Sequence, residues 1–223
     1  MELLSGLSSA SGVRNLGLIS VQMQLDISER VSSIKQALAA NSDEKAKGAV
    51  RKFIPTSQHV YGVRLPLLNQ IAKEHRAGGF ELVEALWKSG AFEEKLLAAK
   101  LLGSSCKKDP DRALTLAKTF AAQTSDWAVC DTLGMQGVKG IAIEKQIELF
   151  AWSNKLVKSR NLWERRLSLV LLTHFVKDKS SRTQIEKTLA RLGGDKEHWS
   201  IECVEAPSDY SQRPLLAFPF RQG

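Results

Sequence analysis

The sequence predicts an all-α protein, an α-α superhelix in which antiparallel helix pairs stack as an α-solenoid. Apolar residues recur at spacings of three and four along most of the chain, the period of one helix face. Proline and glycine breaks separate roughly nine or ten segments of about 10–15 residues. Strand-like alternation is nearly absent. Internal self-similarity is weak, so periodicity alone also allows a compact helical bundle.

The first clear helix begins near Met23 and carries a stripe of Ile27, Val31, Ile34 and Leu38. This spacing places all four side chains on one buried face. The same periodicity predicts further helices within 42–54, 66–77, 80–87, 92–101, 110–120, 126–131, 144–152, 161–175 and 183–192.

Polar residues mark several predicted helix starts. Asp109, Asp126 and Asn161 each precede an apolar stripe, and their side-chain oxygens can accept N–H groups of the first turn. Pro110 suits the first helical position because it has no N–H to satisfy. These signals divide the chain into a leader at 1–22, expected to be disordered, a helical repeat domain at 23–198 and a proline-containing tail at 199–223.

The chain is basic, and the charge is concentrated in one segment. Its 223 residues carry a formal net charge of +8, from 32 basic and 24 acidic residues. Between residues 155 and 191 the only acidic residues are Glu164, Asp178 and Glu186. The basic residues of that segment are Lys155, Lys158, Arg160, Arg165, Arg166, Lys177, Lys179, Arg182, Lys187 and Arg191. Such clustering favours a localised anion-binding face over diffuse solubility charge.

Cysteine usage and hydropathy exclude several other classes. The 3 cysteines form no C-x-x-C pair, which argues against a disulfide framework or a zinc site. No apolar run is long enough to span a membrane. We therefore expect a cytosolic protein without a zinc site or a membrane partner.

Two motifs could carry chemistry. Trp127 and Asp131 are four residues apart, so an indole and a carboxylate share one helix face. In the helix that follows Asn161, Arg165 and Arg166 fall near the positive end of the helix dipole, where cations are unfavourable, which indicates a function. Each feature also has an ordinary structural reading, as a core tryptophan, a capping aspartate or a solvated arginine pair.

Together these motifs resemble the AlkD-like alkylpurine DNA glycosylase family. The segment Tyr61-Gly62-Val63-Arg64-Leu65-Pro66-Leu67-Leu68-Asn69-Gln70-Ile71-Ala72-Lys73 is similar to the signature at the start of that family's repeat array. The Trp127-x-x-x-Asp131 pair resembles its catalytic cleft, and Asn161-x-Trp163-x-x-Arg166 resembles its DNA-contacting helix. The likeness covers roughly 26–198.

The resemblance implies stacked HEAT-like helix pairs that form a concave basic groove for duplex DNA. It implies a monomeric, monofunctional glycosylase that releases N3- and N7-alkylated purines without a base-flipping pocket. Such an enzyme needs no metal ion or organic cofactor, and in a bacterium it would be associated with the nucleoid. Asp131 would stabilise positive charge on the sugar, Trp127 would pack against the sugar, and Arg166 would hold a phosphate. Further DNA contacts are expected from Lys155, Lys158, Arg160, Trp163, Arg165 and Arg64.

The end of the chain departs from the family's pattern. The family has a second cleft tryptophan on a C-terminal helix, whereas Trp199 comes too early and Pro207 interrupts the segment that follows. This departure predicts reduced or absent excision with retained DNA binding. The alternative function is a noncatalytic helical scaffold that binds DNA or an acidic protein. A cysteine nucleophile at Cys130 is less favoured than a buried structural thiol.

Overall fold

A computed structural model describes the backbone of residues 9–54 and 58–192, and side chains from residue 21 onward within those ranges. This part of the chain contains ten α-helices and no β-strand, as the sequence predicts. The helices are α1 (Ser9–Ala40), α2 (Glu44–Phe53), α3 (Leu65–Glu74), α4 (Gly79–Ser89), α5 (Phe92–Ser105), α6 (Pro110–Ala121), α7 (Trp127–Thr132), α8 (Gln146–Leu156), α9 (Leu162–Leu172) and α10 (Arg182–Leu192).

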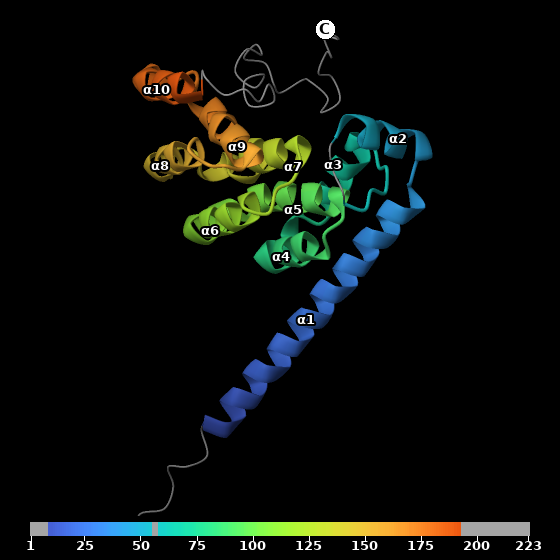
Figure 1. Ribbon diagram of the computed structural model, residues 1–223. Helices are drawn as coiled ribbons and strands as arrows, with labels where there is room; N and C mark the ends of the chain where they lie inside the picture. The colour runs from blue at the N-terminus through green and yellow to red at the C-terminus, as the bar shows by residue number, and fades with distance from the viewer. Residues whose placement is uncertain (1–8, 55–57, 193–223) are drawn as a thin grey trace, which may run out of the picture.

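The helices stack in two layers (Figure 1). Helices α3, α5, α7 and α9 form the inner layer, in which each helix contacts the next. Helices α4, α6, α8 and α10 form the outer layer, and α4 packs on α5 as α8 packs on α9. Pairs of successive helices stacked in this way make a helical repeat solenoid, and the arrangement confirms that prediction over a single bundle.

Helix α1 is longer than the sequence analysis predicts. Its buried side chains include Ile27, Ile34 and Leu38, which confirms the expected stripe, and it packs against α4. The helix begins at Ser9, so it runs through much of the segment expected to be disordered (Figure 1). No proline interrupts residues 9–40, so no residue of this segment lacks the N–H that a continuous helix needs.

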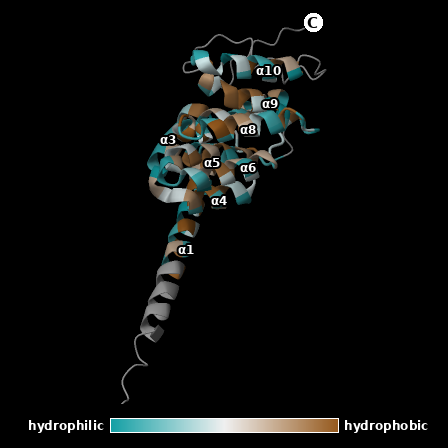
Figure 2. Cartoon of the chain, turned by 90° about the vertical axis from the view of Figure 1, so that its left-hand side faces the viewer, coloured by the Kyte–Doolittle hydropathy of each residue, from teal (hydrophilic) through white to brown (hydrophobic). Residues whose placement is uncertain are grey.

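The apolar core follows the contact between the two layers. Leu97, Leu102, Leu133 and Leu149 are each 0% exposed, and they come from both layers and from the turn after α7. Figure 2 shows hydrophobic residues concentrated within the stack around α5, α8 and α9, with hydrophilic residues toward the outside. The continuous core holds the inner helices at fixed spacing.

The predicted helix starts are confirmed at three polar caps. Asp109, Asp126 and Asn161 each accept a backbone hydrogen bond from the first turn of the following helix. The N–H groups that they satisfy belong to Arg112, Val129 and Trp163, each at 2.9 Å. The caps fix where α6, α7 and α9 begin.

The inner layer contains a π-helical turn that the periodicity does not predict. After Thr132 the chain continues as a π-helix over Leu133–Gly137. The backbone of this turn lies against Gly103 of α5, where an added Cβ would lie 2.1 Å from the carbonyl oxygen of Gln136. A glycine is therefore required for α5 to approach this closely.

We predict that Gly103→Ala lowers the free energy of unfolding by about 1–3 kcal/mol, because a Cβ at this position overlaps backbone atoms that cannot rotate away. Urea denaturation checks this. Gly48→Ala is the matched control, since its Cβ would meet nothing within 4 Å on α2 and the change should stabilise the protein by about 0.5–1 kcal/mol. Equal effects at the two glycines would contradict the close approach.

Candidate functional site

A buried ion pair joins the two motifs singled out in the sequence. Asp131 on α7 and Arg166 on α9 form two parallel hydrogen bonds, Nε to Oδ1 and Nη2 to Oδ2, each 2.7 Å long. Asp131 is 5% exposed and Arg166 is 2% exposed. This planar bidentate geometry is the strongest form of carboxylate–guanidinium contact. The pair therefore fixes both side chains and ties α7 to α9.

Trp127 completes the cluster. Its ring centroid lies 6.0 Å from Cζ of Arg166, and its Nε1–H donates to the carbonyl oxygen of Phe53 at 3.1 Å. The tryptophan is 6% exposed. The structure thus brings Arg166, which is distant in sequence, together with Trp127 and Asp131 on α7.

The cluster differs from the expected arrangement in one respect. The sequence analysis assigned Arg166 to a DNA phosphate and Asp131 to a sugar, whereas here each binds the other. A carboxylate and a guanidinium at this depth are paired because a buried charge without a partner costs several kcal/mol, on the order of 3–5. Either group can therefore bind a ligand only if the ion pair opens or exchanges one of its hydrogen bonds.

Two further contacts hold α7 in place. The carboxylate of Asp126 caps the helix, and the thiol of Cys130 donates to the carbonyl oxygen of Trp163 at 3.3 Å. Cys130 is 0% exposed, which supports the structural reading of this thiol. These contacts set the register of α7, and with it the position of Asp131.

Asp126 is an unusual cap because it is completely buried. One carboxylate oxygen accepts from Val129, while Oδ2 has no hydrogen-bond partner among the described residues. Burial raises the pKa of Asp126 to about 6, and the charge of Asp131 acts in the same direction. The N–H groups of the first turn and the nearby Lys95 oppose this shift. The charged form of Asp126 is thus destabilised beside the ion pair.

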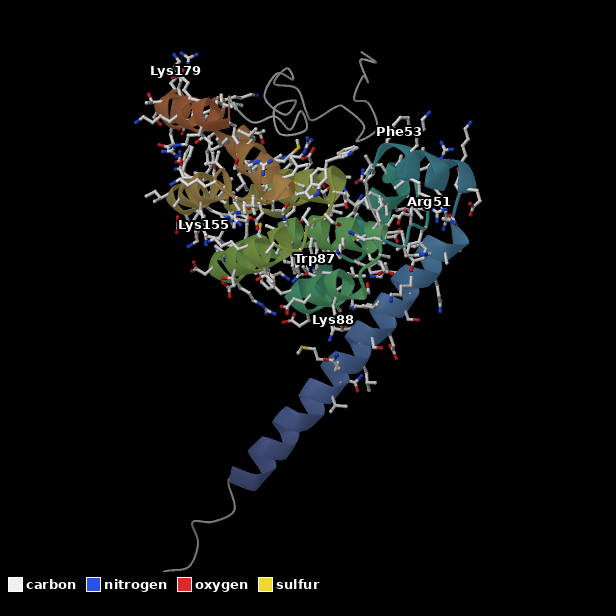
Figure 3. All side chains as sticks on the ribbon, in the orientation of Figure 1. Arg51, Phe53, Trp87, Lys88, Lys155 and Lys179 are labelled. Atoms are coloured by element: carbon white, nitrogen blue, oxygen red, sulfur yellow. The ribbon has the colours of Figure 1, made fainter. Side chains whose placement is uncertain are left out.

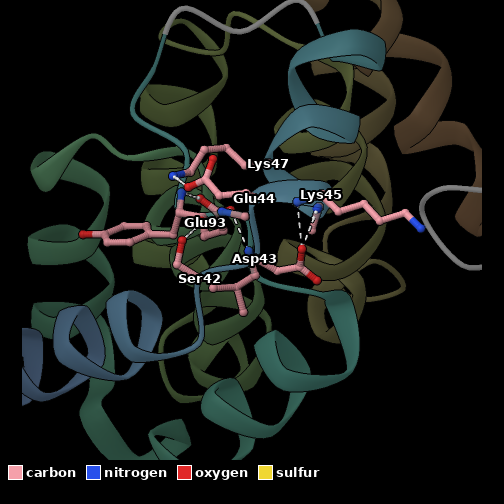
Figure 4. Close-up of polar contacts among 10 residues, drawn as sticks. Ser42, Asp43, Glu44, Lys45, Lys47 and Glu93 are labelled. Atoms are coloured by element: carbon pink, nitrogen blue, oxygen red, sulfur yellow. Dashed lines mark hydrogen bonds and ion pairs between the residues drawn. The ribbon is translucent and has the colours of Figure 1, made fainter.

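The signature segment near Tyr61 has a structural explanation. Glu93, which is 0% exposed, accepts from the backbone N–H of Tyr61 at 2.9 Å, of Gly62 at 2.7 Å and of Val63 at 3.2 Å. Figure 4 shows this carboxylate among the polar residues around the start of α2. Gly62 has a φ of 81°, and a Cβ there would lie 2.5 Å from the carbonyl oxygen of Asp43. The segment anchors the loop before α3 to the start of α5.

Arg64 in this segment is exposed rather than directed into the cluster. Its Nη2 lies 3.0 Å from Oδ2 of Asp43, and its side chain is 68% exposed. The hydrogen bond to Arg64 is the largest cause that lowers the pKa of Asp43. Arg64 therefore lies at the surface near α2, where an exposed ion pair adds little stability.

The lysines expected to contact DNA lie in a different place. A hollow of about 620 Å³ lies between α6, α8 and the first turn of α9. Its lining residues are Lys118, Ala121, Ala122, Glu148, Ala151, Trp152, Lys155, Leu156, Lys158, Ser159 and Glu164. None of the residues of the ion-pair cluster lines it. Lys155, labelled in Figure 3, and Lys158 are exposed at this hollow.

The other predicted contacts lie at the start of α9 and in the loop before it. Arg160 is exposed, and Trp163 is half-buried against the core. Nη1 of Arg165 donates to the carbonyl oxygens of Ser159 and Arg160, at 3.1 Å each, so it also holds the loop before α9. The expected single contact face is therefore spread over the start of α9 and the neighbouring end of α8.

Sequence reasoning missed the charged residues that α5 buries in the inner layer, which are Glu93, Glu94 and Lys100. Lys100 on α5 is 8% exposed, and its Nζ donates to Oε1 of Gln136 at 2.9 Å. Burial lowers the pKa of Lys100 to about 8. A lysine inside the apolar run Leu96–Leu102 was the available signal, since lysine is seldom buried without a role.

Within 9–54 and 58–192, no group of three or more His, Cys, Asp or Glu side chains is placed to hold a metal ion. The helices in these ranges are all too short or too polar to span a bilayer. Trp199, Pro207 and the tail at 199–223 lie outside the described residues.

Comparison with known proteins identifies one family. The family described as DNA alkylation repair enzyme matches residues 34–201, which include the signature segment, the Trp127–Asp131 pair and Arg166. No curated protein matches the chain.

The buried cap at Asp126 yields a prediction about pH. Because its pKa is raised in the folded state, protonation of Asp126 stabilises the fold; this contribution is complete below the ordinary value near 3.8 and is lost as the pH rises through about 6. Asparagine keeps the capping oxygen but carries no charge. Asp126→Asn should therefore raise the free energy of unfolding at pH 7.5 by on the order of 2 kcal/mol.

Urea denaturation of both proteins at pH 7.5 and pH 5 measures this effect. The advantage of the variant should shrink at the lower pH, where the wild-type carboxyl is protonated in the folded state. Groups other than Asp126 cancel in the difference between the two proteins. A difference independent of pH would show that Asp126 is not the group that titrates.

Proposed function

The chain belongs to the DNA alkylation repair enzyme family, and we propose that it is a monofunctional DNA glycosylase. The proposed reaction is hydrolysis of the N-glycosidic bond of N3- and N7-alkylated purines in duplex DNA. The observation that carries the proposal is the bidentate Asp131–Arg166 pair beside Trp127. A paired anion and cation next to an aromatic ring suit a substrate that combines a cationic nucleoside with an anionic phosphate.

The substrate chemistry explains why a carboxylate would suffice. An N3- or N7-alkylated purine already carries a positive charge and leaves readily. As the glycosidic bond breaks, positive charge develops on the deoxyribose, as in other glycosyl hydrolyses. Asp131, held in a low-dielectric environment, would stabilise that charge and orient the attacking water. One group so placed is worth ~3–4 kcal/mol of the barrier, or roughly several hundred-fold in rate.

Arg166 would couple DNA binding to this chemistry. Both oxygens of Asp131 accept from Arg166 in the structure, so the carboxylate is occupied before DNA binds. A phosphate can take over one of these N–H groups, since guanidinium binds carboxylate and phosphate with the same fork geometry. The exchange keeps Arg166 paired and releases an Asp131 oxygen toward the sugar. DNA binding would thus expose the catalytic group.

Trp127 would act as a platform rather than as part of a base-binding pocket. Its ring lies beside Arg166, so its electron-rich face is already suited to a cation. A cationic lesion is attracted to this face, so the base need not be flipped out of the duplex and stacked between two aromatic rings. Further backbone contacts are proposed for Lys155, Lys158, Arg160, Trp163, Arg165 and Arg64, with the protein acting as a monomer.

A noncatalytic DNA-binding scaffold is the alternative, and one observation favours it. Trp127 and Asp131 are 6% and 5% exposed, so little of either reaches solvent. A buried pair that never opens would leave only the basic surface to bind DNA. The C-terminal sequence, which departs from the family's pattern at the second cleft tryptophan, also leads us to expect slower excision than in a family member that has it.

We predict that Asp131→Asn reduces release of 7-methylguanine and 3-methyladenine from methylated duplex DNA by roughly several hundred-fold. DNA affinity should stay the same or rise, because a negative charge is lost beside a phosphate site. Base release is measured by chromatography, and affinity by fluorescence anisotropy on the same duplex.

Since Asp131→Asn breaks a buried pair, its folding is checked by circular dichroism. Ser153→Ala is the control for loss of stability, as it removes the buried hydrogen bond from Ser153 Oγ to the Ser168 carbonyl and should leave excision intact. Undiminished release by Asp131→Asn would eliminate the catalytic role. Tight, salt-dependent binding by the wild type with no released base would establish the scaffold instead.

A further inference from the structure

An ammonium group is buried in the inner layer without a carboxylate partner. Lys100 is 8% exposed, and among the described residues its Nζ forms a hydrogen bond with Oε1 of Gln136 and no ion pair. By contrast, the buried Glu93 accepts three backbone hydrogen bonds and the buried Asp131 is paired with Arg166. A buried cation stabilised by a single neutral amide is costly.

The position of Lys100 relates it to the ion-pair cluster. Gln136 belongs to the π-helical turn that continues α7, and it lies five residues, about one helical turn, beyond Asp131. Lys100 reaches this turn from the adjacent helix α5. The ammonium of α5 therefore contacts the π-helical turn that continues the helix of Asp131.

The surroundings place the ammonium near the surface. Gln136, whose amide accepts its hydrogen bond, is exposed, and so is Ser104, one turn after Lys100 on α5. A ligand that approaches Gln136 would reach Nζ of Lys100 without displacing a carboxylate. The ammonium therefore has room for an anionic partner, which the protein itself does not supply among the described residues.

We propose that Lys100, oriented by Gln136, binds a backbone phosphate of the same duplex whose lesion lies at Asp131. This inference rests on the proposed DNA binding across the inner layer, but not on the excision chemistry. A phosphate would supply the missing counter-charge, and binding would restore the electrostatic stabilisation that burial removes from the free protein. The subsite would hold the strand at the π-helical turn that continues α7 beyond Asp131.

A purely structural role makes the opposite prediction about stability. If Lys100 served only to hold α5 against the π-helical turn, its removal would destabilise the fold. If it is a phosphate ligand, replacing the buried charge with an apolar side chain of similar length leaves the free protein as stable or more stable, and weakens DNA binding.

The experiment measures affinity for an undamaged duplex as a function of salt for the wild type, K100M, K100R and K88M. One lost phosphate contact lowers the slope of log affinity against log salt by about 0.9. We expect that loss in K100M, a smaller one in K100R, and no change in K88M, since Lys88 lies exposed on outer helix α4 (Figure 3). The urea midpoint of K100M should equal or exceed that of the wild type. If K100M does not fold, K100Q replaces it, and we expect the same decrease in the salt slope.

An unchanged slope in K100M would overturn the subsite, and so would an equal loss in K88M, which would indicate only long-range net charge. Base release from methylated duplex separates the two proposals. If the wild type releases alkylated bases but K100M has the wild-type salt slope, this inference alone is refuted. If K100M has a reduced salt slope but the wild type releases no base, the glycosylase proposal is refuted and the phosphate site stands. A wild type without affinity for DNA would refute both.

Discussion

A carboxylate and a guanidinium buried against each other are the interaction on which the rest of the structure depends. Neither Asp131 nor Arg166 could be accommodated at its depth alone, because each charge is stabilised by the other and by two hydrogen bonds. The pair also connects α7 to α9 within the inner layer. Arg166 must be paired to be buried, and in the proposed mechanism it exchanges its carboxylate partner for a phosphate. It would therefore contribute both to the fold and to the reaction.

The surrounding fold keeps these side chains in register. Asp126 fixes the start of α7, Gly103 allows α5 to approach the turn that ends it, and Glu93 ties the signature loop to α5. Each contact satisfies backbone groups or removes a steric conflict, and none needs to touch a ligand. The inner layer is therefore rigid where the charges lie, as expected for a site whose groups act through position.

Much of this arrangement follows from the sequence, because local signals determine it. The oxygens of Asp109, Asp126 and Asn161 cap the helices they precede, and the apolar stripe of α1 is buried from Ile27 to Leu38. The i, i+4 spacing placed Trp127 and Asp131 near one another, and the family match agrees with the resemblance. What periodicity could not show is which distant charges would meet. The pairing of Arg166 with Asp131, the burial of Lys100 beside Gln136 and the π-helical turn all depend on contacts between helices.

A double-mutant cycle on Asp131→Asn and Arg166→Met, with unfolding free energies from urea denaturation, tests the central interaction most directly. Each single change leaves one buried group without its partner and should cost about 3–5 kcal/mol. The double variant should cost less than the sum of the two by about 2–3 kcal/mol, since it leaves no unpaired charge. Costs that add to within about 0.5 kcal/mol would show that the two side chains do not depend on each other, which would contradict this account.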